Sequence, residues 1–182
     1  MRRPRAASCS STARSAEPAA WWPEATGVIF VGGERAAYER WRPLLESILP
    51  SAVHIGAAGQ AMLLKLVANL LVALNSASAA EALAMARRGG LDPGLVVDVL
   101  RTGAATSRML DVRGPMMVSG EFPAQMKLDL FMKDLHLIQE AAGTIGARLP
   151  LTDVAERLYA AAQAAGHGGE DLAVVITELA RE

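Results

Sequence analysis

A long run of residues without helix breakers, from about residue 59 to residue 88, most constrains what this chain can fold into. Its middle part, residues 66–80, carries no charge and is rich in alanine and leucine, which favour helix over sheet. Arg87 and Arg88 complement the helix dipole at its end, and the two glycines that follow are a typical stop signal. A helix of this length spans about 45 Å, which exceeds the width of a small domain, so we expect it to cross between domains or subunits.

The bulk composition narrows the class of protein. The 182 residues suffice for one well-buried domain and leave little for a second. A net charge of −1 with both signs interspersed leaves no footprint for nucleic acid and no polybasic membrane patch. The uncharged stretch 66–80 is interrupted by Asn69 and Asn75 and is too short to cross a bilayer. The single Cys9 excludes an intrachain disulfide, so we expect a reducing, cytoplasmic location.

Residues 26–56 are predicted to form a strand, a helix and a second strand. The apolar run from Val28 to Val31 is typical of a strand buried on both faces, and residues 53–55 form the returning strand. Between them, residues 34–49 form an amphipathic helix. Its expected inward face consists of Ala37, Trp41, Leu44, Leu45 and Ile48. One βαβ unit cannot stand alone as a sheet, so this segment is interpreted as the last piece of a doubly wound nucleotide-binding domain.

Residues 57–182 are predicted to be helical. Asp92 and the following proline open a helix through Leu100, and another helix follows Ser107. A third helix covers residues 128–142, with Leu128, Phe131, Leu135 and Ile138 on one face. Pro150 starts a helix to about residue 165, and the acidic pair after Gly168-Gly169 belongs to the first turn of the last helix.

Residues 1–25 differ from the rest, because they are rich in Arg, Ser, Ala and Pro, show no periodicity and have no acid before Glu17. A signal peptide needs a continuous apolar core, which is absent. A mitochondrial transit peptide fits the composition but should precede a whole enzyme. We favour a wrong start or a shifted reading frame, which would make this a disordered or non-native leader.

The sequence between the second strand and the long helix is distinctive. Gly56, Gly59, Lys65 and Asn69 stand in the order Gly-x-x-Gly-x-Ala-x-x-x-Lys-x-x-Ala-Asn. This resembles the catalytic signature of the β-hydroxyacid dehydrogenases, Gly-x-x-Gly-x-Gly-x-x-x-Lys-x-x-Asn-Asn, the family of 3-hydroxyisobutyrate dehydrogenase. The chain departs from the pattern at the third glycine and at the first asparagine. The resemblance runs from about residue 26 to the C-terminus.

The resemblance implies a role for each matching residue. Lys65 would be the general acid/base, and Asn69, on the same helix face one turn later, would hold the substrate. Gly56 and Gly59 would let the backbone approach the substrate closely where strand passes into helix. Further on, Lys133-Asp134-Leu135 matches the family's Lys-Asp-Leu motif, so Lys133 would reach towards the nicotinamide or the substrate carboxylate. Asp134, the second residue of this motif, would hold the local structure around Lys133, and the two together would belong to the cofactor-binding residues.

Plainer interpretations compete with each of these roles. Lys65 could extend to solvent near the start of a long helix, and Asn69 could be a satisfied polar residue at a helix contact. Lys133 could form an exposed ion pair with Asp129 at i,i+4 spacing. The three histidines share no metal-ligand spacing, so no metal site is expected.

The resemblance implies a mainly α fold: the C-terminal helical domain of the 6-phosphogluconate dehydrogenase-like type, preceded by a remnant βαβ unit of a Rossmann domain. It also implies NAD- or NADP-dependent interconversion of a small 3-hydroxy acid and its aldehyde or keto form, in a homodimer or homotetramer built on the long helix. However, the cofactor fingerprint Gly-x-Gly-x-x-Gly and the family's Ser-Gly-Gly substrate loop are absent. The alternative is therefore an inactive remnant that acts as a helical dimerisation module.

Overall fold

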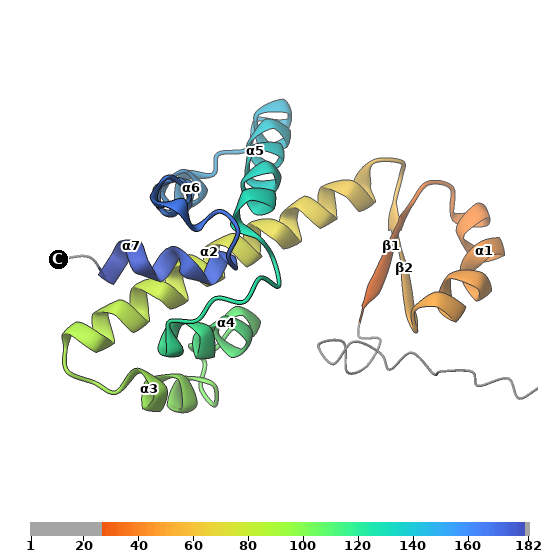
Figure 1. The fold of residues 1–182 in the computed structure, drawn as a ribbon. Coiled ribbons are helices and arrows are strands. Elements are labelled where there is room, and N and C mark those ends of the chain that lie inside the picture. The colour runs from red at the N-terminus through yellow and green to blue at the C-terminus, as the bar shows by residue number, and fades with distance from the viewer. Residues whose placement is uncertain (1–26, 181–182) are drawn as a thin grey trace, which may run out of the picture.

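The structure, a computed structural model, describes residues 27–180, and the predictions for residues 1–25 lie outside this range. The first part of the described chain is a βαβ unit, and the remainder is helical (Figure 1). The elements of the βαβ unit are β1 (Val28–Gly32), α1 (Arg35–Ile48) and β2 (Ser51–Gly56). The helical part comprises α2 (Gln60–Arg88), α3 (Pro93–Leu100), α4 (Arg108–Ser119), α5 (Leu128–Ile145), α6 (Pro150–Ala162), the π turn η1 (Gln163–His167), the 3-10 turn η2 (Leu172–Val175) and α7 (Ile176–Ala180).

The long helix α2 is the axis of the molecule, as its sequence predicts. One end carries the βαβ unit, and the other helices gather around the remainder of α2 (Figure 1). It contacts both strands as well as α3, α4, α5, α6 and α7. The predicted bounds are confirmed within one residue, and Gly89 is the C-cap. In the described part of the chain, one helix, α2, is long and apolar enough to span a membrane. Core helices of globular proteins meet the same criterion of length and composition.

The core of the helical part lies where α5, α6 and η2 meet α2. Phe131 and Tyr159 contact edge to face, with ring centroids 5.8 Å apart. The Tyr159 hydroxyl donates to the Ala73 carbonyl of α2 at 2.8 Å. Burial strongly raises the pKa of Tyr159, because a phenolate there would lose its hydration. The predicted α5 face of Leu128, Phe131, Leu135 and Ile138 is buried in this core, which confirms the periodicity.

A buried ion pair connects α4 to the C-terminal segment. Arg113 Nε donates to Asp171 Oδ1 at 2.9 Å, and both side chains are nearly inaccessible to solvent. The Asp171 carboxylate also accepts from the backbone N–H groups of Met126 and Ala173. Asp171 is thus the cap of η2, whereas the sequence interpretation placed it inside the first turn of the last helix. These three hydrogen-bonding partners satisfy a charge that would otherwise be costly to bury.

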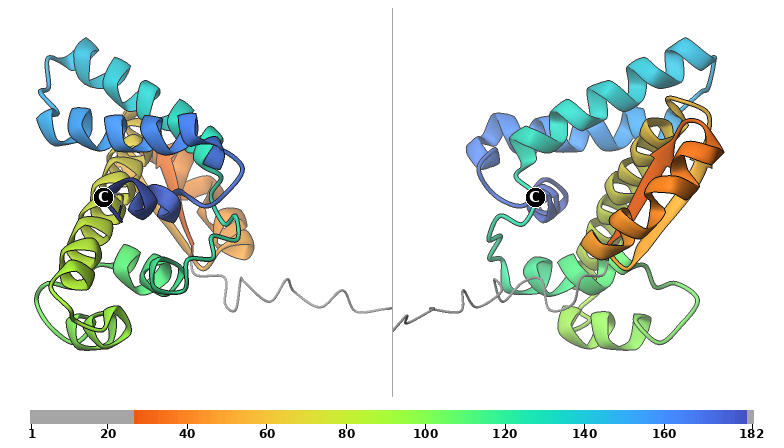
Figure 2. Two further views of the ribbon diagram at one scale, coloured as in Figure 1. Left: turned by 60° about the vertical axis from the view of Figure 1, so that its left-hand side comes forward. Right: turned by 90° about the vertical axis from the view of Figure 1, so that its right-hand side faces the viewer.

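Two other helix ends differ from the prediction. α5 continues to Ile145, three residues beyond the predicted end, before Gly146 adopts a left-handed conformation. α6 ends at Ala162 and is continued by η1, in which Gly166 has φ +97°. In Figure 2, α5 and α6 run side by side in opposite directions. The predicted cap of α3 is confirmed, because the Asp92 side chain accepts the Gly94 N–H. α4 follows Ser107 as predicted, and the Ser107 side chain caps it by accepting the Leu110 N–H.

The βαβ unit has the predicted elements but not the predicted burial. β1 and β2 are parallel and form a two-stranded sheet, and α1 covers one face of it (Figure 2). Only Tyr38 of α1 is buried, whereas the expected inward residues Trp41, Leu44 and Ile48 are 53%, 55% and 65% exposed. β1 is likewise not buried on both faces. The prediction was wrong here because two strands are too narrow to cover the apolar side of the helix.

Candidate active site

The loop between β2 and α2 brings the matching segment to the end of the sheet. Gly56 has φ +150° and Gly59, the N-cap of α2, has φ +90°, conformations that favour glycine. A Cβ on Gly56 would also collide with the side chain of Gln60, whose Oε1 accepts from the Ala57 N–H at 3.0 Å. Gly33 N–H donates to Gly56 O at 2.7 Å, so the loop is joined to β1. The two glycines therefore shape the entry to α2.

Lys65 lies on the second turn of α2 and is exposed, so the structure does not bury it as its apolar neighbours in the sequence suggest. Among the described residues it has no ion-pair or hydrogen-bond partner. With Phe30, Ala61 and Met62 it lines an open groove of about 270 Å³ between β1 and α2. The other three side chains that line this groove are apolar, so the Lys65 ammonium is its polar side-chain group. Such a group is available for a ligand.

Asn69 connects the two segments of the sequence that resemble the dehydrogenase motifs. Its Nδ2 donates to Asp134 Oδ2 at 2.9 Å, across 65 residues of sequence, and both residues are half-buried. The contact joins α2 to α5. The amide is therefore satisfied on one N–H and oriented by a carboxylate, while its second N–H and its carbonyl oxygen are not used by this bond.

Lys133 follows the same pattern as Lys65. It is exposed, and the ion pair with Asp129 is absent, because the Asp129 carboxylate accepts instead from Gln163 Nε2 at 2.6 Å. The chain has only three lysines, at positions 65, 127 and 133, and within residues 27–180 none forms an ion pair. The ion pairs of this region use arginine or histidine. Two of the three unpaired ammonium groups thus belong to the two matching segments.

Two groove residues are absent from the sequence interpretation. Phe30 reaches the Lys65 groove from β1, and Met62 stands three residues before Lys65 on α2. The signal for Met62 is helical spacing, since i and i+3 lie on one side of a helix. No signal within the sequence places β1 beside α2, because that contact depends on the turn through Gly56 and Gly59.

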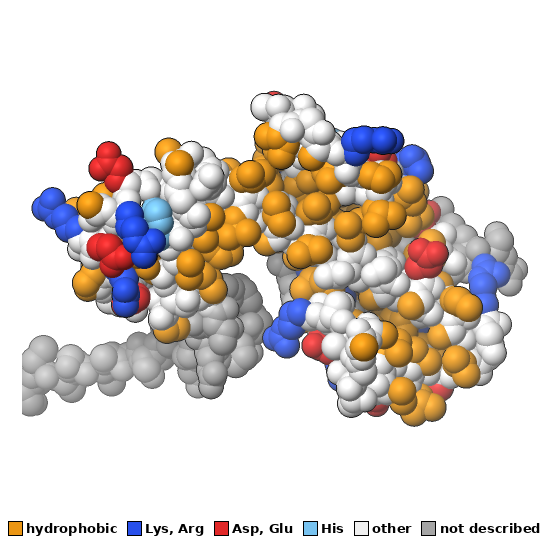
Figure 3. All heavy atoms as spheres, turned by 180° about the vertical axis from the view of Figure 1, so that it is seen from behind, with side chains coloured by type: hydrophobic (Ala, Val, Ile, Leu, Met, Phe, Trp, Pro, Cys, Tyr) orange, Lys and Arg blue, Asp and Glu red, His pale blue; other side chains and the backbone are white. Residues whose placement is uncertain are grey.

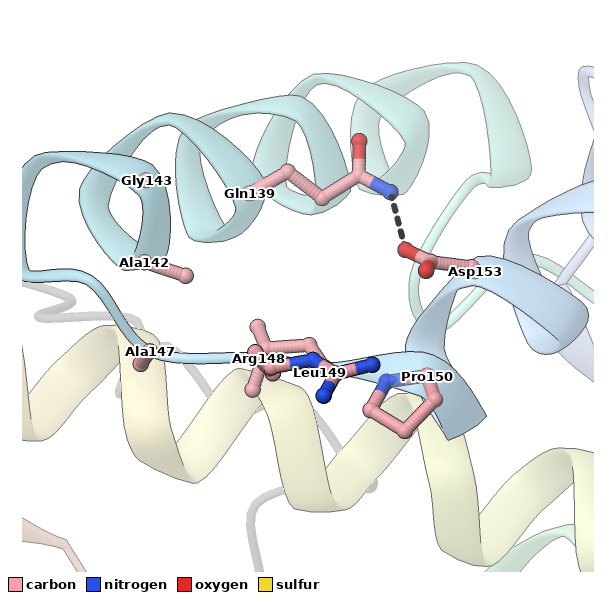
Figure 4. A pocket seen from close by; sticks show the side chains of 8 residues that line it. All are labelled: Gln139, Ala142, Gly143, Ala147, Arg148, Leu149, Pro150 and Asp153. Carbon is pink, nitrogen blue, oxygen red and sulfur yellow. Dashed lines mark hydrogen bonds between the residues drawn. The ribbon is translucent and has the colours of Figure 1, made fainter.

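Another hollow lies away from these residues. It has a volume of about 460 Å³ between the C-terminal end of α5 and the start of α6. Figure 4 shows Gln139 and Asp153 pointing towards each other across it, with Nε2 and Oδ1 3.4 Å apart. It contains neither Lys65 nor Asn69. The described residues also contain no group of three or more His, Cys, Asp or Glu side chains that could hold a metal ion.

Comparison with known proteins adds to this geometry. The family model described as the NAD-binding domain of NADP-dependent 3-hydroxyisobutyrate dehydrogenase matches residues 57–179. The chain is similar to 2-hydroxy-3-oxopropionate reductase of Escherichia coli, with 35% identity over 149 residues, or 82% of this chain and 50% of the relative. It resembles the structure of 3-hydroxyisobutyrate dehydrogenase of Mycobacterium tuberculosis with L-serine, with a TM-score of 0.77 and 29% identity. The match covers 86% of this chain and 56% of that chain. The structure of Psf3 in complex with NADP+ and 2-OPP matches with a TM-score of 0.70 and 26% identity. This match covers 84% of this chain and 53% of that chain.

The helical part thus has the fold of dehydrogenases similar to 3-hydroxyisobutyrate dehydrogenase. The chain belongs to the 3-hydroxyisobutyrate dehydrogenase family, whose model covers the whole helical part from the α2 entry to α7. The match to the reductase includes part of the βαβ unit too, because only 126 residues follow position 56 whereas 149 are matched. The chain spans about half the length of the curated relatives it matches.

Proposed function

We propose that this chain provides the proton-transferring and substrate-holding part of an NAD(P)-dependent dehydrogenase that interconverts a small 3-hydroxy acid and its aldehyde or keto form. The hydrogen bond between Asn69 and Asp134 carries this proposal. It brings together two segments, each with an unpaired lysine, that are separate in the sequence and both match the family's motifs. Of the plainer interpretations, the ion pair of Lys133 with Asp129 is absent. An exposed Lys65 and an Asn69 that is hydrogen-bonded at a helix contact agree with the plainer interpretations of those two residues as well as with the proposal.

In the proposed reaction, Lys65 handles the proton. In the oxidation, its neutral amine accepts the proton of the substrate hydroxyl, and in the reduction its ammonium form returns a proton to the nascent alkoxide. Asn69 offers a carbonyl oxygen and one N–H to the substrate, and Lys133 offers a positive charge to the substrate carboxylate or to the cofactor. When bound, NAD(P) supplies the hydride acceptor or donor. Gly56 and Gly59 let the backbone of the α2 entry approach the substrate.

The residues of this chain fit the nicotinamide end of such a cofactor. The unpaired ammonium groups of Lys65 and Lys133 and the half-satisfied amide of Asn69 are donors suited to a carboxamide or carboxylate. The phosphates would need a glycine-rich loop after a strand, and no Gly-x-Gly-x-x-Gly occurs in the sequence. We therefore assign only the nicotinamide and substrate end to these residues.

The test is Lys65→Ala, with Lys127→Ala as matched control because Lys127 is also exposed and unpaired. With NADPH and 2-hydroxy-3-oxopropionate as probe substrates, we expect kcat to fall about 10²- to 10⁴-fold in the first variant and to stay unchanged in the second. Circular dichroism checks that both retain the helical fold. Equal turnover of Lys65→Ala and the unmodified chain would refute the role of Lys65. Because the sequence offers no glycine-rich loop for the phosphates, turnover is measured with the part of the Escherichia coli 2-hydroxy-3-oxopropionate reductase outside the match added to each variant. No turnover of the unmodified chain in its presence would favour the dimerisation-module alternative.

We further propose that the helical part forms a homodimer, the unit from which a homotetramer would be built, in the cytoplasm. A shallow groove of about 90 Å³ between α2 and α5 is lined only by aliphatic side chains, among them Leu63, Val67 and Ile145. These three are exposed, and Leu71 extends the same side of α2. From behind, hydrophobic side chains continue from the βαβ unit over the adjoining part of the molecule onto the helices (Figure 3). A surface of this kind is typical of an interface between copies.

A further inference from the structure

The Lys65 groove combines one charged side chain with three apolar ones. Phe30 reaches it from β1, and Ala61 and Met62 line it from α2. Phe30 is 36% exposed and Met62 is 59% exposed, so both side chains present apolar surface to a molecule that enters the groove. A ligand whose reacting group lies at the Lys65 ammonium would therefore place a neighbouring part of itself against apolar atoms.

The walls of the groove are held by the close approach of β1 to the start of α2. A Cβ at Gly32 would lie 2.9 Å from the Ala57 carbonyl oxygen and 3.4 Å from the Ala61 Cβ, so strand and helix are in contact there. Phe30 pairs with Val53 in the parallel ladder, which fixes its place in β1. Ala61 stands at the position of the third glycine in the dehydrogenase pattern, and its methyl group adds apolar surface to the groove.

The polarity of these walls discriminates between substituents at C2 of a 3-hydroxy acid, the carbon next to the reacting one. With Lys65 engaged by the reacting hydroxyl, a second hydroxyl at C2 would lose water and find no partner on Phe30, Ala61 or Met62. An unpaired polar group of this kind weakens binding about five- to a hundredfold. An alkyl group would instead gain about two- to fourfold in affinity for each methylene that is removed from water.

The groove is also larger than a methyl group requires. A methyl group is about the size of a water molecule, whose share of the liquid is about 30 Å³. The groove encloses about 270 Å³. The flexible thioether of Met62 adapts to irregular apolar shapes, and the Phe30 ring adds a broad apolar contact. A chain of several carbons would therefore make more contact here than a methyl group.

We propose that the site prefers 3-hydroxy acids with an apolar C2 substituent of several carbons, and that Phe30 and Met62 determine this preference. The substituent lies in the Lys65 groove, while the C3 hydroxyl meets the Lys65 ammonium. The inference rests on the proposed function, because it names the substrate class of the same site. It predicts that affinity falls from a butyl group through a methyl group to a hydroxyl at C2.

Equilibrium binding to the full chain tests this order without turnover. The probes are glycerate, 3-hydroxyisobutyrate and 2-(hydroxymethyl)hexanoate, which carry a hydroxyl, a methyl and a butyl group at C2. Calorimetry should give a Kd that falls about eight- to sixtyfold from the methyl to the butyl acid. Met62→Gln should reduce this ratio at least about threefold, because an amide replaces the thioether in the wall. The matched control is Met85→Gln, at a more exposed methionine of α2 outside the groove, which should leave the ratio unchanged.

Two further measurements locate the bound acid. Lys65→Met should raise the Kd of all three acids by a similar factor of about ten, because it removes the group that meets their shared hydroxyl. With isotope-labelled methionine methyl groups, the butyl acid should shift the NMR signal of Met62 and leave that of Met85 in place. Circular dichroism checks that each variant retains the helical fold.

Glycerate that binds as tightly as the butyl acid would overturn the proposal, and so would equal effects of Met62→Gln and Met85→Gln on the ratio. Absence of binding of all three acids at about 50 mM would also overturn it. Kd values that Lys65→Met leaves unchanged would do the same, because the acids would then bind away from Lys65. The predicted order of affinity without turnover, measured with the added part of the Escherichia coli reductase, would instead contradict only the proposed function.

Discussion

At the scale of single residues, the position of Asn69 depends on Asp134. An asparagine amide can present either its oxygen or its nitrogen, and a carboxylate partner selects the nitrogen because it can only accept. The bond from Asn69 Nδ2 to Asp134 Oδ2 therefore leaves the amide oxygen available for a substrate. A bond to a charged acceptor contributes about 1.5–3 kcal/mol. The residue that tunes substrate binding is thus expected to lie on α5, outside the α2 motif.

We expect Asp134→Ala to lower kcat/KM about tenfold, chiefly through a higher KM, because Asn69 loses its fixed orientation. The same change should lower the free energy of unfolding by about 1.5–3 kcal/mol, the contribution of this bond. Asn75→Ala, on the same helix as Asn69, is the control and should change neither value. Steady-state kinetics and urea denaturation measure both. If Asn69→Ala lost activity while Asp134→Ala kept its kcat/KM, the positioning role of Asp134 would be wrong.

At the scale of elements, the C-terminal segment is held by a charge pair in addition to apolar contacts. Arg113 of α4 and Asp171 before η2 are buried together, and the carboxylate also caps η2. The residues that follow, Leu172 to Val175, are fully buried against the helical part. Removing one partner would leave the other as an uncompensated buried charge, which is far more costly than losing an exposed pair.

Arg113→Ala should therefore destabilise the protein by about 3–5 kcal/mol. Arg101 offers a matched control, because its pairs with Asp98 and Asp111 are largely exposed. Arg101→Ala should cost less than about 1 kcal/mol. Chemical denaturation followed by circular dichroism compares the two variants. If both variants lost a similar free energy of unfolding, the buried pair would contribute no more to stability than the exposed pairs.

At the scale of the whole molecule, α2 has several different sides. One is buried by α4 to α7, another carries Lys65 and Asn69, and a third carries the exposed Leu63, Val67 and Leu71. A helix with so wide an apolar surface is typically covered by a further partner. In the homodimer that we propose, a second copy covers the third side.

The double substitution Val67→Glu and Leu71→Glu should convert such a dimer into monomers, because two carboxylates per chain would face an apolar surface. Size-exclusion chromatography with light scattering gives the mass of each form. Leu95→Glu on α3 adds a comparable charge elsewhere and should leave the dimer intact. A monomeric parent chain, or a dimer that survives the double substitution, would contradict the proposed interface.

The sequence by itself determined the local structure. Capping residues, glycine stops and apolar spacing indicated the bounds of α2 and α3, the start of α4 and the buried face of α5, because these signals act over one or two helical turns. The motif around Lys65 also indicated the family. Only the tertiary structure decided that Asn69 meets Asp134, that Arg113 meets Asp171, and that the apolar side of α1 is left uncovered. Periodicity shows which side of a helix is apolar, but what covers that side depends on segments far apart in the chain that only packing brings together.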